Sequence, residues 1–218
     1  MKFYPLILTG LASLSCGLLL AGCANLGRSR NLSEPRVPPE VTARQVCADC
    51  HGADGVSTSP NFPRLAGQPT EYLVSQLQNF RSKNRSDPAG YEYMWGLTRH
   101  LSDAQIAGLA AYFSRQAPQA NRAAALNLAP MGKQIFEQGI AAKQTPACQG
   151  CHGQNAEGVA TIPRLAQQHQ DYLRKQLRVF STTEQRPDTP MKVVAHNLDN
   201  ADIEAVSAYL QGLPLVRH

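Results

Sequence analysis

Cys47-Ala48-Asp49-Cys50-His51 and Cys148-Gln149-Gly150-Cys151-His152 are two copies of the pentapeptide Cys-x-x-Cys-His, one in each half of a chain of 218 residues. Two cysteines separated by two residues can reach the two vinyl groups on one edge of a porphyrin. This spacing, followed by histidine, is the attachment pattern of c-type haem, and the histidine lies beneath the iron as its proximal ligand. We therefore predict two covalently bound haem c groups, attached through Cys47, Cys50, Cys148 and Cys151, with His51 and His152 as iron ligands.

A Cys-x-x-Cys pair also occurs in zinc sites and in redox-active dithiols. The two pairs together contain the four ligands that a structural zinc ion requires, but zinc does not explain a histidine directly after each pair. A redox dithiol usually occurs once, beside a βαβ pattern, which this sequence lacks. Haem attachment accounts for the whole repeated pentapeptide.

The similarity between the two halves continues beyond the pentapeptide. Matching segments are Pro63-Arg64-Leu65-Ala66 with Pro163-Arg164-Leu165-Ala166, Tyr72-Leu73 with Tyr172-Leu173, and Ala111-Tyr112 with Ala208-Tyr209. Self-similarity of this kind indicates a duplicated unit. We place the first domain at residues 39–117, the second at residues 130–218, and an Ala- and Asn-rich linker at residues 118–129.

The hydrophobic pattern predicts an all-α fold. Short helices are expected over residues 39–50 and 130–139, each leading into a pentapeptide, and a longer helix over residues 70–81. Ser102 and Gln105 have the spacing of a capping box, and apolar residues with helical periodicity follow them. No segment shows the alternation of a half-buried strand.

Two methionines are the candidates for the sixth ligand of each iron. Met94 and Met191 occupy equivalent places in the two repeats, shortly before the last helix, whereas Met131 has no counterpart. Ligation by histidine and methionine raises the reduction potential of the iron above that of two histidines and leaves no open position. The competing ligands are four histidines that are not repeated: His100, His169, His196 and His218.

The segments after each pentapeptide suggest supporting contacts. A carbonyl near Pro63 or Pro163 could accept the other N–H of the proximal histidine and fix its orientation. Leu65 and Leu165 could pack on the porphyrin. The candidates to meet the haem propionates are Arg64, Arg164, Tyr72 and Tyr172. Ordinary helix and turn packing is the alternative for all of these residues.

The N-terminus reads as a targeting segment. Lys2 precedes an apolar run that ends in Leu20-Ala21-Gly22-Cys23, which resembles the lipobox of bacterial lipoproteins. We predict a signal peptide over residues 1–22, lipidation of Cys23 and a tether over residues 23–38, with export to the periplasm. Ala24 favours sorting to the outer membrane. The alternatives are an ordinary cleaved signal and an uncleaved anchor.

The charge distribution argues against a nucleic-acid partner. The formal net charge is +5, but residues 40–117 contain equal numbers of basic and acidic side chains, and residues 23–39 carry a surplus of two positive charges. A concentrated basic face, which nucleic-acid binding requires, is not visible. The basic tether would instead favour an anionic membrane surface.

The pentapeptides, the Pro-Arg-Leu-Ala segments, the Tyr-Leu-x-x-Gln-Leu helices and the placed methionines together resemble the cytochrome c4 family, over about residues 40–213. The resemblance implies two class I cytochrome c domains packed with pseudo-twofold symmetry. It also implies delivery of electrons from a quinol-oxidising cytochrome complex to a terminal oxidase or reductase, through transient contacts with redox proteins.

These features predict an electron carrier in a bacterial respiratory chain rather than an enzyme, with no small-molecule substrate. One alternative is a dihaem enzyme, such as a peroxidase or a thiosulfate dehydrogenase, which needs an exchangeable position on one haem. Another is the cytochrome subunit of a larger dehydrogenase complex.

Overall fold

The computed structural model describes residues 31–88, 90–119, 129–182, 186 and 189–215. Over these residues the chain is helical and contains no β-strand, only two isolated bridges. The prediction of an all-α fold is therefore confirmed. The predicted signal peptide, Cys23, most of the predicted linker and His218 lie outside the described residues.

The first domain begins with one nearly continuous helical segment that runs into the first pentapeptide. The elements of this domain are α3 (Pro39–Thr42), η1 (Ala43–Cys47), α4 (Ala48–His51), α5 (Thr70–Arg81), η2 (Gly90–Met94), α6 (Trp95–Thr98) and α7 (Asp103–Ser114). The bounds of α5 are those that the apolar pattern predicts. The short helix α6 separates Met94 from the last helix, which the sequence did not indicate.

The core of the first domain forms where α5 and α7 pack together. Ile106, Leu109 and Phe113 of α7 belong to one hydrophobic cluster with Leu73 of α5. Ser102 caps α7, since its hydroxyl oxygen accepts a hydrogen bond from the backbone N–H of Gln105, and the Gln105 side-chain oxygen accepts one from the Ser102 N–H. This confirms the predicted capping box, which satisfies two N–H groups that a helix start leaves free.

The second domain has the same order of principal helices but reaches its pentapeptide differently. The elements of this domain are α8 (Ala129–Gln138), η4 (Ala141–Lys143), α9 (Gln149–His152), α10 (Gln170–Thr182), α11 (Met191–Ala195) and α12 (Asn200–Gly212). The predicted helix over 130–139 is present, but a loop separates it from α9. Gly139 ends α8 with a φ of +73°, and a Cβ there would lie 2.3 Å from the carbonyl oxygen of Thr145.

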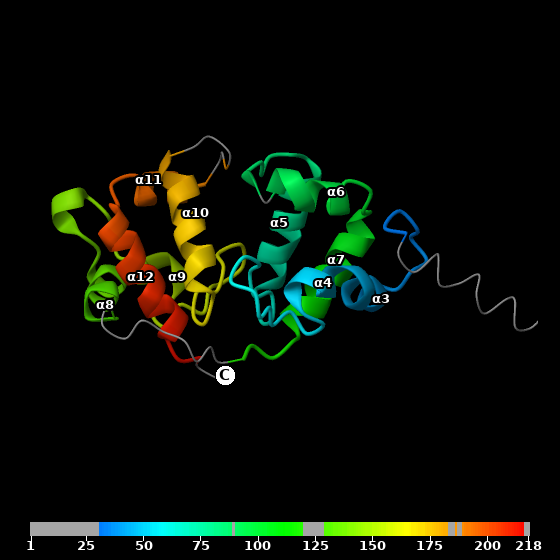
Figure 1. The fold of residues 1–218 in the computed structure, drawn as a ribbon, viewed down its shortest axis with the longest axis horizontal. Helices are drawn as coiled ribbons and strands as arrows, with labels where there is room; N and C mark the ends of the chain where they lie inside the picture. The colour runs from blue at the N-terminus through cyan, green and yellow to red at the C-terminus, as the bar shows by residue number, and fades with distance from the viewer. Residues whose placement is uncertain (1–30, 89, 120–128, 183–185, 187–188, 216–218) are drawn as a thin grey trace, which may run out of the picture.

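The two domains lie side by side in Figure 1, with α5 and α10 toward the middle and the other helices of each domain outside them. Polar contacts join the two domains. The guanidinium of Arg85, which follows α5, donates to the hydroxyl of Tyr172 on α10 at 3.3 Å.

Gly132 allows α8 to cross closely over α12. A Cβ at position 132 would lie 2.1 Å from the Ala205 carbonyl oxygen and 2.6 Å from the Tyr209 Cβ. Because these atoms belong to a packed helix, the two helices would have to separate. We expect Gly132→Ala to lower the free energy of unfolding by about 1–3 kcal/mol, the usual cost of overpacking, as measured by guanidinium denaturation of the holoprotein.

Gly96 is the matched control for this substitution. It also lies within a helix, α6, but a Cβ there meets no atom within 4 Å. Gly96→Ala should raise stability by about 0.5–1 kcal/mol, because alanine loses less backbone entropy on folding. Equal effects of the two substitutions would show that close crossing of α8 and α12 is not what Gly132 provides.

Candidate haem-binding sites

Each pentapeptide folds as a single helical turn that ends at its histidine. α4 ends at His51 and α9 at His152, and the following Gly52 and Gly153 adopt φ values of +80° and +85°. Glycine adopts this left-handed conformation without steric cost. The chain therefore turns sharply after each histidine, whose side chain is buried, with 8% of His51 and 6% of His152 exposed.

Both histidines are held through the same ring nitrogen. His51 Nδ1 lies 2.9 Å from the carbonyl oxygen of Pro63, and His152 Nδ1 lies 3.0 Å from that of Pro163. Because a carbonyl can only accept, Nδ1 carries the proton and the lone pair is left on Nε2. This confirms the hydrogen bonds predicted near the two prolines and leaves each imidazole with the nitrogen that a metal ion would use.

The surroundings also keep these imidazoles neutral. Burial lowers the pKa of both His51 and His152, although the bonds to Pro63 and Pro163 act in the opposite direction. Metal ligation requires the neutral ring, so the lowered pKa suits a ligand.

The first cysteine of each pair is packed against a hydrophobic core. Cys47 contacts the cluster around Ile106, and Cys148 contacts the cluster around Phe136. Burial raises the pKa of each of these two thiols to about 11. Zinc binding and dithiol chemistry both need thiolates, and reactive dithiols lower the pKa of the attacking cysteine. Thioether formation removes the ionisable proton, so the buried apolar setting of Cys47 and Cys148 is compatible with haem attachment.

Two equivalent arginines have hydrogen-bonding capacity that the protein leaves unused. Arg64 Nη1 donates to the Gln119 carbonyl at 2.8 Å, and Arg164 Nη2 donates to the Ala66 carbonyl at 2.7 Å. Both Nε atoms are buried and have no partner among the described residues. A buried N–H without an acceptor is costly, and a haem propionate would supply one to each. Arg64 and Arg164 therefore fit the predicted haem groups.

A buried polar cluster between the domains was missed in the sequence. Arg85 forms a 2.9 Å ion pair with the fully buried Asp87, and both contact Gln176 of α10. Burial is the largest single influence and disfavours the charged carboxylate, but the charges of Arg85 and Arg186 and the hydrogen bonds from Arg85 and Gln176 together lower the pKa of Asp87. Arg186 Nη2 also donates to the side-chain oxygen of Gln76 on α5, at 2.9 Å. The tripeptide Arg-x-Asp at 85–87 recurs at 186–188, and this repetition was the available signal.

The two tyrosines expected near the propionates adjoin this cluster. Tyr172 accepts a hydrogen bond from Arg85, and the partly buried Tyr72 lies within the electrostatic influence of Arg186 and Arg85. Their positions connect α5 and α10 at the interface between the domains.

The candidate methionines occupy matching positions. Met94 is the last residue of η2 and Met191 the first of α11, and both are partly buried, whereas 42% of Met131 is exposed. Of the competing histidines, His100 and His196 are exposed. His169 is buried, and its Nε2 lies 2.9 Å from the Ser57 carbonyl oxygen in the other domain. Among the described histidines outside the pentapeptides, His169 thus serves as a contact between domains.

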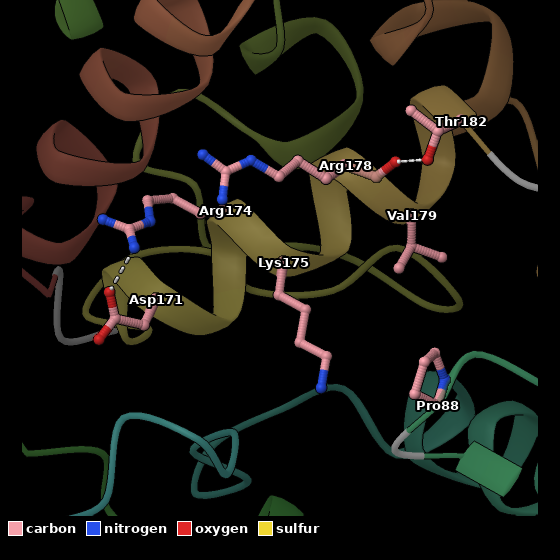
Figure 2. Close-up of a pocket in the computed structure, with 7 residues that line it drawn as sticks. All are labelled: Pro88, Asp171, Arg174, Lys175, Arg178, Val179 and Thr182. Atoms are coloured by element: carbon pink, nitrogen blue, oxygen red, sulfur yellow. Dashed lines mark hydrogen bonds and ion pairs between the residues drawn. The ribbon is translucent and has the colours of Figure 1, made fainter.

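A hollow in the surface beside α10 is separate from these sites. Figure 2 shows Arg174, Lys175 and Arg178 around it, with Pro88 of the first domain on the far side. Arg174 is paired with Asp171 at 3.2 Å. None of the pentapeptide residues lines the hollow, and we assign it no haem.

Comparison with known proteins identifies the family. The cytochrome c family model matches residues 40–116 and again 129–214. Cytochrome c4 of Pseudomonas aeruginosa is 41% identical to this chain, over 77% of this chain and 84% of the relative. The crystal structure of reduced recombinant cytochrome c4 from Pseudomonas stutzeri superposes with a TM-score of 0.71 at 40% identity, covering 81% of this chain and 97% of that one. The chain belongs to the cytochrome c4 family.

A more distant relative has a different name. The thiosulfate dehydrogenase electron acceptor of Thiomonas intermedia is 33% identical to this chain, and 82% of each chain is covered.

Membership of the cytochrome c4 family establishes two covalently bound haem c groups and a coarse function as a dihaem electron carrier. It also confirms the prediction of two cytochrome c domains. No helix of the described part of this cytochrome is long and apolar enough to cross a membrane.

The contact of His169 with Ser57 predicts a pH dependence of stability in this cytochrome. Burial lowers the pKa of His169; the nearby Arg64 acts in the same direction, and Ser57 and Asp171 oppose it. The unfolded chain therefore binds more protons than the folded chain as the pH falls below the usual histidine value of about 6.5, so stability falls with pH there. We expect His169→Gln, which retains a donor, to lose less thermal stability than the parent between about pH 7.5 and pH 5.

The exposed His196 is the control for this measurement. His196→Gln should retain the parental pH dependence. If His169→Gln retains it as well, the buried contact does not account for the loss of stability in acid.

Proposed function

We propose that this protein carries single electrons between redox proteins of a bacterial respiratory chain, in the periplasm, and that it acts as a carrier rather than an enzyme. The observation that carries the proposal is the pair of equivalent buried histidines, His51 and His152, each bound through Nδ1 to a proline carbonyl behind a Cys-x-x-Cys pair. Two matching sites with the same second ligand would leave no position for a substrate.

The proposed site residues follow the two repeats. The cysteines that attach haem are Cys47, Cys50, Cys148 and Cys151, and the axial ligands are His51 with Met94 and His152 with Met191. When bound, each haem supplies one-electron exchange between ferric and ferrous iron. The protein orients each proximal imidazole, buries it away from water, and offers the Arg64 and Arg164 Nε–H groups to the propionates. The proposed domain bounds are 39–117 and 130–218.

The proposed donor is a quinol-oxidising cytochrome complex or a dehydrogenase, and the proposed acceptor is a terminal oxidase or reductase. Membership of the cytochrome c4 family supports this assignment. Contacts with such partners are expected to be small and transient, as is usual in electron transfer. The test is a stopped-flow measurement with reduced donor complex. Monophasic reduction of both haems at a rate that falls with ionic strength supports the proposal, and failure of any such complex to reduce the protein contradicts it.

A second candidate function is to accept electrons from a thiosulfate-oxidising enzyme. The relative from Thiomonas intermedia, whose name is that of such an acceptor, supports this candidate. Purified protein mixed with thiosulfate alone should remain oxidised, because neither iron has an open position. Reduction that requires an added thiosulfate dehydrogenase would favour the acceptor role, whereas reduction by thiosulfate alone would show that the chain is itself the enzyme.

The lipid anchor remains a proposal that rests on Leu20-Ala21-Gly22-Cys23. Mass spectrometry of the N-terminal peptide should find the acylated Cys23, and Cys23→Ser should release the cytochrome from the membrane fraction. A free mature N-terminus at another residue would favour an ordinary cleaved signal.

A further inference from the structure

Two glutamines exchange hydrogen bonds across the interface between the domains. Gln168 Oε1 accepts from the backbone N–H of Arg64 at 2.8 Å, and its Nε2 donates to the Arg64 carbonyl at 3.0 Å. Gln68 does the same with Arg164, at 2.9 Å for both bonds. Only 3% of Gln68 and 2% of Gln168 is exposed, so water does not compete for these bonds.

The backbone groups that the glutamines bind are connected to the proximal histidines. A peptide group joins the carbonyl of one residue to the N–H of the next. The Arg64 N–H that Gln168 binds therefore belongs to the same peptide group as the Pro63 carbonyl that holds His51. In the other domain, a single peptide group likewise lies between Gln68 and His152.

Hydrogen bonds therefore join three groups in series: a glutamine amide, a peptide group and the imidazole of a proximal histidine. There are two such series, and each begins in one domain and ends in the other. Hydrogen bonds in series polarise one another, more strongly where the surroundings exclude water. An acceptor on the N–H end of a peptide group makes its carbonyl oxygen more negative. A stronger carbonyl acceptor draws the Nδ1 proton of the histidine and makes Nε2 a better electron donor. A better donor stabilises ferric iron and lowers the reduction potential.

We infer that Gln68 and Gln168 are positioning residues that set the reduction potential of the haem in the opposite domain, each acting through one peptide group on a proximal histidine. The inference rests on the proposed ligation by His51 and His152. It makes the domain interface part of the electronic environment of both irons. The potential of each haem then depends on the docking of the other domain.

The local structure presents both glutamines in the same way. Each follows a Pro-Arg-Leu-Ala segment, and its N–H donates to the carbonyl of Leu65 or Leu165 at 3.1 Å. The bond is thus a property of the repeat and is not confined to one domain. Gln211 provides a contrast, since its side chain is also buried and accepts a backbone N–H, from Gln170 at 2.7 Å, but within its own domain.

The experiment is a redox titration of the full-length holoprotein and four variants. The two haems are distinguished by their separate methyl resonances in partly reduced samples, each assigned by contacts to side chains of its own domain. Gln168→Met removes the acceptor at similar volume and should raise the potential of the first haem. The expected change is about threefold in its reduction equilibrium constant, which is about 30 mV for one electron. Gln68→Met should raise the potential of the second haem similarly.

Two further variants separate tuning from packing. Gln168→Glu keeps an oxygen acceptor for the Arg64 N–H, so the first haem should not show the rise in potential that is expected for Gln168→Met. Gln211→Met should move neither potential. If a glutamine only held the domains together, its substitution would lower the unfolding temperature but would not raise the potential of the haem in the opposite domain.

The potentials of the Gln168→Met variant decide whether the inference fails. If Gln168→Met keeps the parental low-spin spectrum and both potentials, or shifts only the second haem, the inference is overturned. If Gln168→Met does not fold, Gln68→Met makes the same test on the second haem. A parental spectrum without histidine-ligated low-spin haem would instead contradict the proposed ligation, which separates that failure from failure of this inference.

Discussion

Replacing Cys47 and Cys50 together by serine is expected to leave one covalent haem on the chain and a first domain that no longer unfolds cooperatively. The core of this domain is a small cluster around Ile106, Leu109 and Phe113, against which Cys47 packs. A unit of about 80 residues buries a limited share of its surface and is only marginally stable alone. Haem contributes the missing apolar centre, so its loss should leave a collapsed but poorly packed domain.

The measurement combines haem content with thermal unfolding. The ratio of haem to protein, from the pyridine haemochrome spectrum, should fall to half the parental value, and the near-ultraviolet circular dichroism of the first domain should be lost. The pair Cys148→Ser with Cys151→Ser is the matched variant and should affect the second domain instead. A cooperative thermal transition in a fully haem-free preparation would contradict the premise that haem completes each core.

Within each domain the sequence was sufficient for most of the architecture. The apolar spacing after Thr70 predicts α5, and Ser102 with Gln105 predicts the start of α7, because both signals depend on residues close together in the chain. The loop between α8 and α9 was not predicted. It depends on the left-handed turn at Gly139 and on the pairing of Ile140 with Thr145, which have no counterpart in the first repeat to compare with.

The interface between the domains was the part that the sequence did not reveal. Alignment of the two repeats singles out residues that occur in both copies. It does not single out His169, because the equivalent residue in the first repeat is Pro69. Yet His169 binds Ser57, and Ser57 Oγ in turn donates to the carbonyl of Cys50 at 3.2 Å. Contacts of this kind depend on how two folded domains dock, which the periodicity of neither domain contains. Gln68 and Gln168 occupy equivalent positions in the two repeats, but only the folded structure shows which backbone groups they bind.

Replacing Met94 by histidine is expected to lower the potential of the first haem by on the order of 0.1–0.3 V, within the span of about 0.8 V that axial ligands cover. Imidazole donates more electron density to iron than a thioether does and so stabilises the ferric state. Met191→His should do the same to the second haem. The titration should then separate into two steps with the lower step on the altered haem, and the near-infrared band of the methionine–iron bond should fall to half.

Met131→His is the matched control, because it introduces the same side chain at a position that is exposed on α8 and has no counterpart in the first domain. Both potentials and the full near-infrared band should be retained. An unchanged titration of Met94→His would remove Met94 from the coordination sphere. The first iron would then have either another ligand or an open position, and an open position would favour the dihaem enzyme over the carrier. Since Met94 precedes α6 and Met191 begins α11 at equivalent points, the two substitutions should agree, and a shift in only one would show that the repeated sequence does not produce two equivalent irons.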